Sequence, residues 1–156
     1  PPPGVTMAVA TSVAAGSQSC ATYSDGSGWC WGFNVYGGVG DNSERNIYDS
    51  SYPNRAWPVP VWGLRDADGI DASASAACAR FLTSSAPEQV LLKCWGSMGV
   101  GERGRLGQVY TSKPFTLLDT RGVQKVAVGE GFACGLLVGG RVECWGRGPT
   151  GLAPGL

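Results

Sequence analysis

The sequence predicts an all-β protein built from repeated antiparallel hairpins. Its 156 residues include 25 Gly and 10 Pro, a composition typical of a folded chain with many turns. The tripeptide Cys-Trp-Gly occurs three times, and each copy follows a leading cysteine. The leading cysteines, Cys20, Cys78 and Cys134, are 58 and 56 residues apart. This regular spacing indicates a repeat architecture with one supersecondary unit in each copy.

The distance between the two cysteines of each repeat predicts a hairpin. If both cysteines face each other across antiparallel strands, the turn lies halfway between them. This places turns at residues 24–27, 83–89 and 138–140, which are rich in Gly, Ser or Pro. Directly opposed strand residues are close enough for a disulfide, so we expect three local bridges. The expected pairs are Cys20 with Cys30, Cys78 with Cys94, and Cys134 with Cys144.

Six cysteines are also compatible with free thiols, as in a cytosolic protein, or with metal ligation. Zinc sites usually contain Cys-x-x-Cys pairs or combine Cys with His, and this sequence has neither pattern. An even count with pairing inside each repeat favours an oxidising compartment, so we expect an extracellular or cell-surface location. Each bridge should contribute about 2–3 kcal/mol by restricting the unfolded chain.

The order of motifs in each repeat resembles the RCC1-type repeat. An apolar stretch containing Val13, Ile70 or Val126 precedes each leading cysteine, and a Gly-rich stretch follows each Cys-Trp-Gly. A Pro-containing link begins at Pro58 and again at Pro114. The resemblance covers nearly the whole chain. It implies a β-propeller of four-stranded antiparallel blades, usually seven to a ring.

We therefore expect about three RCC1-type blades in an incomplete ring, with hairpins around residues 13–32, 70–96 and 126–146. A seven-bladed ring of this period needs about 400 residues. Further repeats of the same chain, or other subunits, are expected to complete it. Residues 1–4 are interpreted as a Pro-rich edge or linker. The position two before the leading cysteine, often His in the family, is Gln18, Ala76 and Phe132 here, which weakens any carry-over of family function.

The segment 41–57 is the longest polar insertion, and it contains aromatic and arginine residues that do not repeat. Tyr, Trp and Arg on a loop are the residue types that most often anchor interfaces. We therefore expect partner binding at five residues of this segment: Arg45, Tyr48, Tyr52, Arg55 and Trp57. An ordinary loop between blades, with its aromatic residues packed against the sheet, is the alternative. The repeated Trp31, Trp95 and Trp145 are instead expected to fill the space between neighbouring sheets.

Several classes of function lose support from composition. Lys and Arg together number 12, as do Asp and Glu, so the zero formal charge argues against nucleic-acid binding. No apolar run approaches the roughly 18 residues of a membrane helix, so we expect no direct membrane insertion.

Catalytic and metal sites also lose support. Without histidine, Ser-His-Asp and Cys-His sites are excluded. Three carboxylates at Asp66, Asp68 and Asp71 hint at calcium but lack the EF-hand spacing. We expect no enzyme activity, cofactor or metal.

Two functions remain open. The first is a non-catalytic, extracellular module that recognises a protein or glycan through blade loops or assembles into a larger surface structure. The resemblance extends to receptor-kinase ectodomains of the Crinkly type, secreted bacterial inhibitors and algal wall glycoproteins. The alternative is an intracellular guanine-nucleotide exchange or chromatin-docking protein, as the founding member of the family implies. Paired cysteines and neutral charge favour the first.

Overall fold

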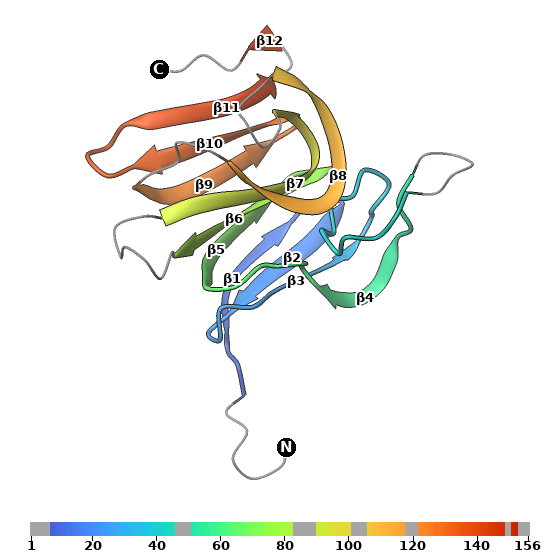
Figure 1. The fold of residues 1–156 in the computed structure, drawn as a ribbon. Helices are drawn as coiled ribbons and strands as arrows, with labels where there is room; N and C mark the ends of the chain where they lie inside the picture. The colour runs from blue at the N-terminus through green and yellow to red at the C-terminus, as the bar shows by residue number, and fades with distance from the viewer. Residues whose placement is uncertain are drawn as a thin grey trace.

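The computed structural model describes residues 7–45, 51–82, 90–100, 106–117, 122–148 and 151–152. All regular structure in these residues is β, and it forms three four-stranded antiparallel sheets in chain order. Figure 1 shows the sheets stacked from the first, in blue, to the third, in orange and red. The all-β class and the four-stranded blades expected from the sequence are confirmed. The Pro-rich edge expected at residues 1–4 lies outside the described residues.

Each sheet is one blade, and its strands are neighbours in sequence order. Blade 1 contains β1 (Ala10–Ala15), β2 (Gln18–Tyr23), β3 (Gly28–Gly32) and β4 (Arg55–Pro60). Blade 2 contains β5 (Ala67–Ala72), β6 (Ala76–Leu82), β7 (Val90–Val100) and β8 (Leu106–Leu117). Blade 3 contains β9 (Val123–Gly129), β10 (Phe132–Leu137), β11 (Val142–Gly148) and β12 (Gly151–Leu152).

The second and third strands of each blade pair in the register expected from the cysteines. The two cysteines of each repeat lie directly opposite each other and form a disulfide, with Cα–Cα distances of 4.1, 4.1 and 4.0 Å along the chain. The turn at 138–140 has the expected length, because the Leu137 N–H donates to the Arg141 carbonyl at 2.7 Å. The turn at 24–27 also lies where the spacing places it. The expected turn at 83–89 lies outside the described residues.

The first strands of the blades also share a register. Val13, Ile70 and Val126 each lie opposite the residue that follows the leading cysteine. The first repeat is one residue shorter before that cysteine, and the missing residue falls in the turn between β1 and β2. A strand pattern is preserved only when a length change falls in a turn, because a slip of one residue reverses the faces.

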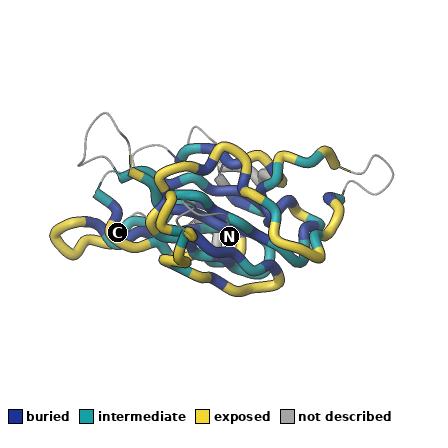
Figure 2. The backbone as a smooth tube through the Cα atoms, turned by 90° about the horizontal axis from the view of Figure 1, so that it is seen from below, coloured by how far each residue is buried: buried dark blue, intermediate teal, exposed yellow. Residues whose placement is uncertain are grey.

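The blades are joined by two buried clusters, one between blades 1 and 2 and one between blades 2 and 3. Figure 2 shows the buried segments running through the middle of the molecule, with exposed loops at its edges. Neighbouring first strands are also linked directly. The Val128 N–H of β9 donates to Asp71 Oδ2 of β5 at 2.7 Å, and the Ser12 hydroxyl of β1 approaches the Ile70 carbonyl at 3.5 Å.

Candidate functional site

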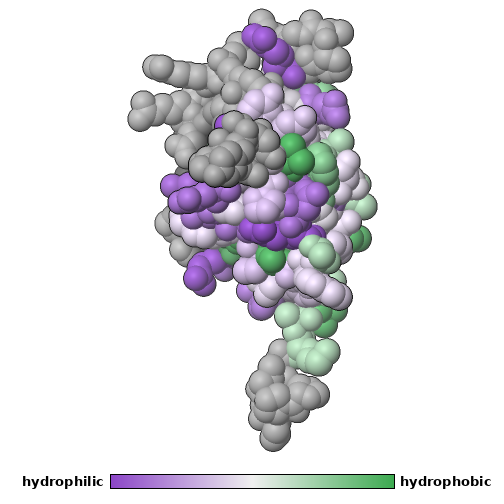
Figure 3. All heavy atoms as spheres, turned by 90° about the vertical axis from the view of Figure 1, so that its right-hand side faces the viewer, coloured by the Kyte–Doolittle hydropathy of each residue, from purple (hydrophilic) through white to green (hydrophobic). Residues whose placement is uncertain are grey.

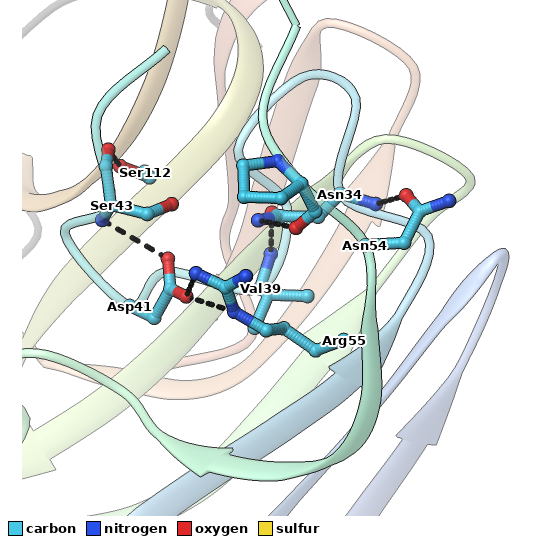
Figure 4. A network of polar contacts seen from close by, with 8 residues as sticks. Asn34, Val39, Asp41, Ser43, Asn54, Arg55 and Ser112 are labelled. Carbon is cyan, nitrogen blue, oxygen red and sulfur yellow. Dashed lines mark hydrogen bonds and ion pairs between the residues drawn. The ribbon is translucent and has the colours of Figure 1, made fainter. Parts of the chain in front are cut away.

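The loop that follows β3 is held by a buried asparagine. The side chain of Asn34 is fully buried and donates to the Pro53 carbonyl at 2.9 Å, while its own oxygen accepts the Val39 N–H at 2.9 Å. The Asn34 N–H donates to Asn54 Oδ1 at 2.8 Å. Figure 4 shows these contacts joining the two ends of the loop. The described parts of the loop, residues 33–45 and 51–54, are thereby held against each other.

The same loop is tied to the next blade by polar contacts. Arg55 forms a salt bridge with Asp41 at 2.5 Å, and Asp41 also accepts the Ser43 N–H at 3.1 Å (Figure 4). The hydroxyl of Ser112, on β8, donates to the Ser43 carbonyl at 2.6 Å. The Asn42 N–H donates back to the Ser112 carbonyl at 2.9 Å. Part of the segment 41–57 therefore connects blades 1 and 2.

Of the five residues expected to bind a partner, the four that the structure describes are not gathered in one exposed surface. Tyr52 is buried, with 7% of its surface exposed, and the Arg45 guanidinium lies 5.7 Å from the centre of its ring. Arg55 is occupied by the salt bridge to Asp41. Trp57, on β4, is 81% exposed. Tyr48 lies outside the described residues. Partner binding by these residues stays a prediction. Trp57 offers an exposed ring surface for such binding.

The register of the outer strands explains why Trp57 is exposed. Val59 lies opposite Cys30 as Phe115 lies opposite Cys94, so Trp57 corresponds to Lys113 in blade 2. The ammonium of Lys113 lies 5.3 Å from the ring of Trp62, in the link between β4 and β5. Position 113 therefore contacts the link that leaves the preceding blade. Trp57 occupies the equivalent position on blade 1.

The repeated tryptophans also differ in how deeply they are buried. Trp95 is fully buried, and its indole N–H donates to the Gly38 carbonyl of blade 1 at 2.8 Å. Trp145 is half-buried and packs against the cluster between blades 2 and 3, and Trp31 is also half-buried. On β1, Val13 is 73% exposed, whereas its equivalent on β5, Ile70, is 6% exposed. Core packing therefore holds fully for Trp95, and Trp145 packs against a buried cluster from a half-buried position.

A pocket of about 390 Å³ crosses all three blades, and we call it the three-blade pocket. It is lined by Ser17, Phe33, Tyr36, Ala74, Ser75, Ser97, Tyr110, Glu130, Gly131 and Arg147. One backbone hydrogen bond recurs in every blade, from the residue after Cys-Trp-Gly to the residue before the second strand. These bonds run from Phe33 to Ser17 (3.2 Å), from Ser97 to Ser75 (2.9 Å) and from Arg147 to Gly131 (2.9 Å).

The repeat architecture thus brings equivalent positions of three blades together, while their side chains differ. The position after Cys-Trp-Gly carries a phenyl ring in Phe33, a hydroxyl in Ser97 and a guanidinium in Arg147. Backbone hydrogen bonds hold these positions whatever the side chain is, because only main-chain atoms take part. The side chains of Phe33 and Arg147 can therefore differ without disturbing the shared backbone bond.

Aromatic rings form one wall of the three-blade pocket. Tyr36 stacks on Tyr110, with ring centres 5.4 Å apart, and Phe33 meets Tyr36 edge to face at 6.2 Å. The guanidinium of Arg45 lies 5.8 Å from the centre of the Tyr110 ring. Tyr36 and Tyr110 are each 41% exposed. The wall combines accessible ring surface with fixed ring positions.

Sequence reasoning did not identify this pocket, because its residues come from three repeats. Phe33, Ser97 and Arg147 could have been found by comparing the residue after each Cys-Trp-Gly. Tyr110 had no such signal. It lies in the part of β8 that pairs with the end of β7, and blade 1 has no matching pair between β3 and β4.

Two of the three carboxylates considered for calcium have structural partners instead. Asp68 forms a salt bridge with Arg80 at 2.6 Å, and Asp71 accepts the Val128 N–H. In the described part of the chain, no three metal-ligating side chains are grouped.

Two groups outside the three-blade pocket have lowered pKa values. Hydrogen bonds from Ser27 lower the pKa of Asp25, and burial lowers the pKa of Lys93. Among the described residues, no helix is long and apolar enough to cross a membrane.

Comparison with known proteins identifies the fold. No family model matches the sequence, and a search of curated proteins finds no match. Among solved structures, yeast RCC1 (Prp20), determined with Kap60, aligns over 93% of this chain with a TM-score of 0.65 and 22% identity. Human WBSCR16 aligns over 96% with a TM-score of 0.71 and 18% identity. The CRINKLY ectodomain of the Arabidopsis thaliana receptor kinase ACR4 aligns over 95% with a TM-score of 0.50 and 22% identity.

The chain spans 31%, 37% and 41% of the lengths of these three structures, respectively. The aligned region includes nearly all of this chain, and the three described sheets match propeller blades in number of strands and in order. The described residues therefore fold as three consecutive blades of an RCC1-like repeat propeller.

Proposed function

We propose that this chain is a non-catalytic interaction module that works outside the cell or at its surface and recognises a protein or glycan partner. The observation that carries the proposal is the three-blade pocket. Equivalent backbone positions meet there, yet they carry an aromatic ring, hydroxyls and charges of both signs. A concave site with a few convergent polar groups is the usual form of a ligand-binding site.

The disulfides support an oxidising environment. All six cysteines are paired inside their own repeats, and Cys20, Cys30, Cys78 and Cys94 are completely buried. Such bridges form and persist in secreted proteins and are rare in the cytosol. The alternative, intracellular exchange or chromatin docking, has less support, although the structural relative Prp20p has been characterised for binding to Gsp1p and histones. That relative supports a protein partner in general.

A second contact surface is proposed on the side of blade 1 that bears Val13, Trp31 and Trp57. The equivalent positions of blade 2, Ile70 and Trp95, are buried against blade 1. A further blade, from the same chain or from another subunit, would cover this side in the same way. The exposed apolar area of Trp57 and Val13 gives that contact a driving force.

The proposal can be tested on arrays of immobilised extracellular proteins and glycans, probed with the oxidised protein. The test variant is Arg147→Glu, which reverses a charge in the pocket. The control is Arg141→Glu, which makes the same change at the opposite end of β11, at a 71% exposed side chain. Partners that are lost with Arg147→Glu and kept with Arg141→Glu support recognition through the pocket. Equal binding by both variants would contradict it.

A further inference from the structure

The aromatic wall of the three-blade pocket is preorganised. Tyr110 is fixed by the stacked ring of Tyr36 and by the guanidinium of Arg45, and its carbonyl accepts the Tyr52 hydroxyl at 3.4 Å. Rings that are already held in place lose little freedom when a ligand binds. The face of an aromatic ring carries negative charge, so it attracts the weakly positive C–H bonds of an alicyclic ring.

The polar groups of the pocket suit a ligand rich in hydroxyls. Ser17 and Ser75 contribute hydroxyls, which donate and accept. Glu130 contributes an acceptor, and Arg147 contributes several donors in a plane. Among the described residues, neither Glu130 nor Arg147 has an ion-pair partner. Hydroxyl groups of a sugar can donate to the carboxylate and accept from the guanidinium at the same time.

Several main-chain groups of the pocket already make hydrogen bonds within the fold. The carbonyl oxygens of Ser17, Ser75 and Gly131 already accept the recurring N–H groups of their blades at 2.9–3.2 Å. Gly131 accepts a second bond from Gly99 N–H at 2.7 Å. Peptides that add to a sheet need free main-chain donors and acceptors. Fewer main-chain groups remain for a peptide strand, which favours a sugar that binds through side chains over an extended peptide.

The charges of the pocket are balanced, with one carboxylate at Glu130 and one guanidinium at Arg147. An anionic polymer would need several cations, and these are absent from the described lining. We infer that the three-blade pocket binds a neutral saccharide, with a sugar ring against Tyr36, which Tyr110 supports from behind, and its hydroxyls between Glu130 and Arg147. This inference rests on the proposed function, because it specifies the partner of the same pocket.

The test is calorimetric titration of the oxidised protein with neutral hexose, pentose and N-acetylhexosamine oligosaccharides. We expect at least one sugar to bind with a dissociation constant of about 1 mM or tighter. Tyr36→Ala should weaken that sugar at least about tenfold, whereas Tyr36→Phe, which keeps the ring, should weaken it by less than about threefold. The control is Trp62→Ala, which removes a 47% exposed aromatic ring that lies outside the pocket lining and in neither proposed binding surface. It should leave affinity unchanged.

A proline-rich peptide is titrated in parallel, because aromatic grooves also bind polyproline helices. The inference is overturned if no sugar binds up to about 10 mM, ten times the expected dissociation constant. It is also overturned if Tyr36→Ala binds sugar as the unchanged protein does. If the peptide alone binds and depends on Tyr36, the saccharide inference fails but recognition through the pocket stands. If neither ligand binds and the arrays show no dependence on Arg147, both proposals fail.

Discussion

The indole nitrogen of Trp95 donates a 2.8 Å hydrogen bond to the carbonyl oxygen of Gly38, which lies in the preceding blade. The loop can approach the ring this closely because it is made of glycines. A Cβ atom at Gly40 would lie 2.7 Å from Trp95 Nε1, and Gly40 has a φ of +72°. The side chain of Trp95 thus packs blade 2 against the glycine-rich loop of blade 1 that contains Gly38 and Gly40.

Trp95→Ala should lower the free energy of unfolding by about 3–5 kcal/mol, because it removes a fully buried ring and its hydrogen bond. The matched control is Trp57→Ala, where the ring is 81% exposed and the change should stay within about 0.5 kcal/mol. Chemical denaturation followed by circular dichroism measures both. Equal losses for the two variants would show that Trp95 does not hold the blades together.

Gly40→Ala should destabilise the protein more than Gly63→Ala. Both glycines have positive φ, +72° and +63°, so both substitutions carry a backbone cost of about 1–2 kcal/mol. A methyl group at position 63 meets nothing within 4 Å, whereas at position 40 it meets the ring of Trp95. The difference between the two variants in thermal melting therefore reports the contact alone. Similar melting temperatures would contradict the close approach of loop and ring.

Tyr52→Ala should reduce stability by about 2–4 kcal/mol, since the ring is buried and contacts Arg45. Arg55→Ala should cost about 1 kcal/mol, because its salt bridge with Asp41 is partly exposed. Trp57→Ala should instead reduce association with a neighbouring blade or subunit, which sedimentation measures. If Tyr52→Ala folds with unchanged stability and weakens association, the division of this loop into structural and surface residues is wrong.

The bridge between Cys134 and Cys144 should be reduced first. Both of its cysteines are half-buried, whereas Cys20, Cys30, Cys78 and Cys94 are completely buried. Thiol exchange requires the attacking thiolate to reach a sulfur atom, so access controls the rate. Brief treatment with dithiothreitol, followed by alkylation and peptide mass spectrometry, identifies the order. Simultaneous reduction of all three bridges would mean that the blades open together.

The hairpins could be predicted from the sequence because antiparallel pairing obeys simple arithmetic. When Cys134 faces Cys144, the turn must lie at 138–140, and two glycines with positive φ are found there. The prediction needs no information from other repeats. For the same reason it was equally accurate for Cys20 and Cys30.

The contacts between blades could not be predicted, because they depend on how the sheets stack. Tyr52 was proposed for partner binding, with packing against the sheet as the alternative, and its hydroxyl reaches the carbonyl of Tyr110, 58 residues away in sequence. No local pattern specifies such a contact. The three-blade pocket has the same origin, since Phe33, Ser97 and Arg147 meet only after the blades have packed.

The most direct test of the account is peptide mapping, without reduction, of the protein purified from its native source. The disulfides fix the hairpin register and support the oxidising location. We predict three bridges and no free thiol: Cys20 with Cys30, Cys78 with Cys94, and Cys134 with Cys144. Free cysteines would contradict the proposed location, and a bridge between different repeats would contradict the blade architecture itself.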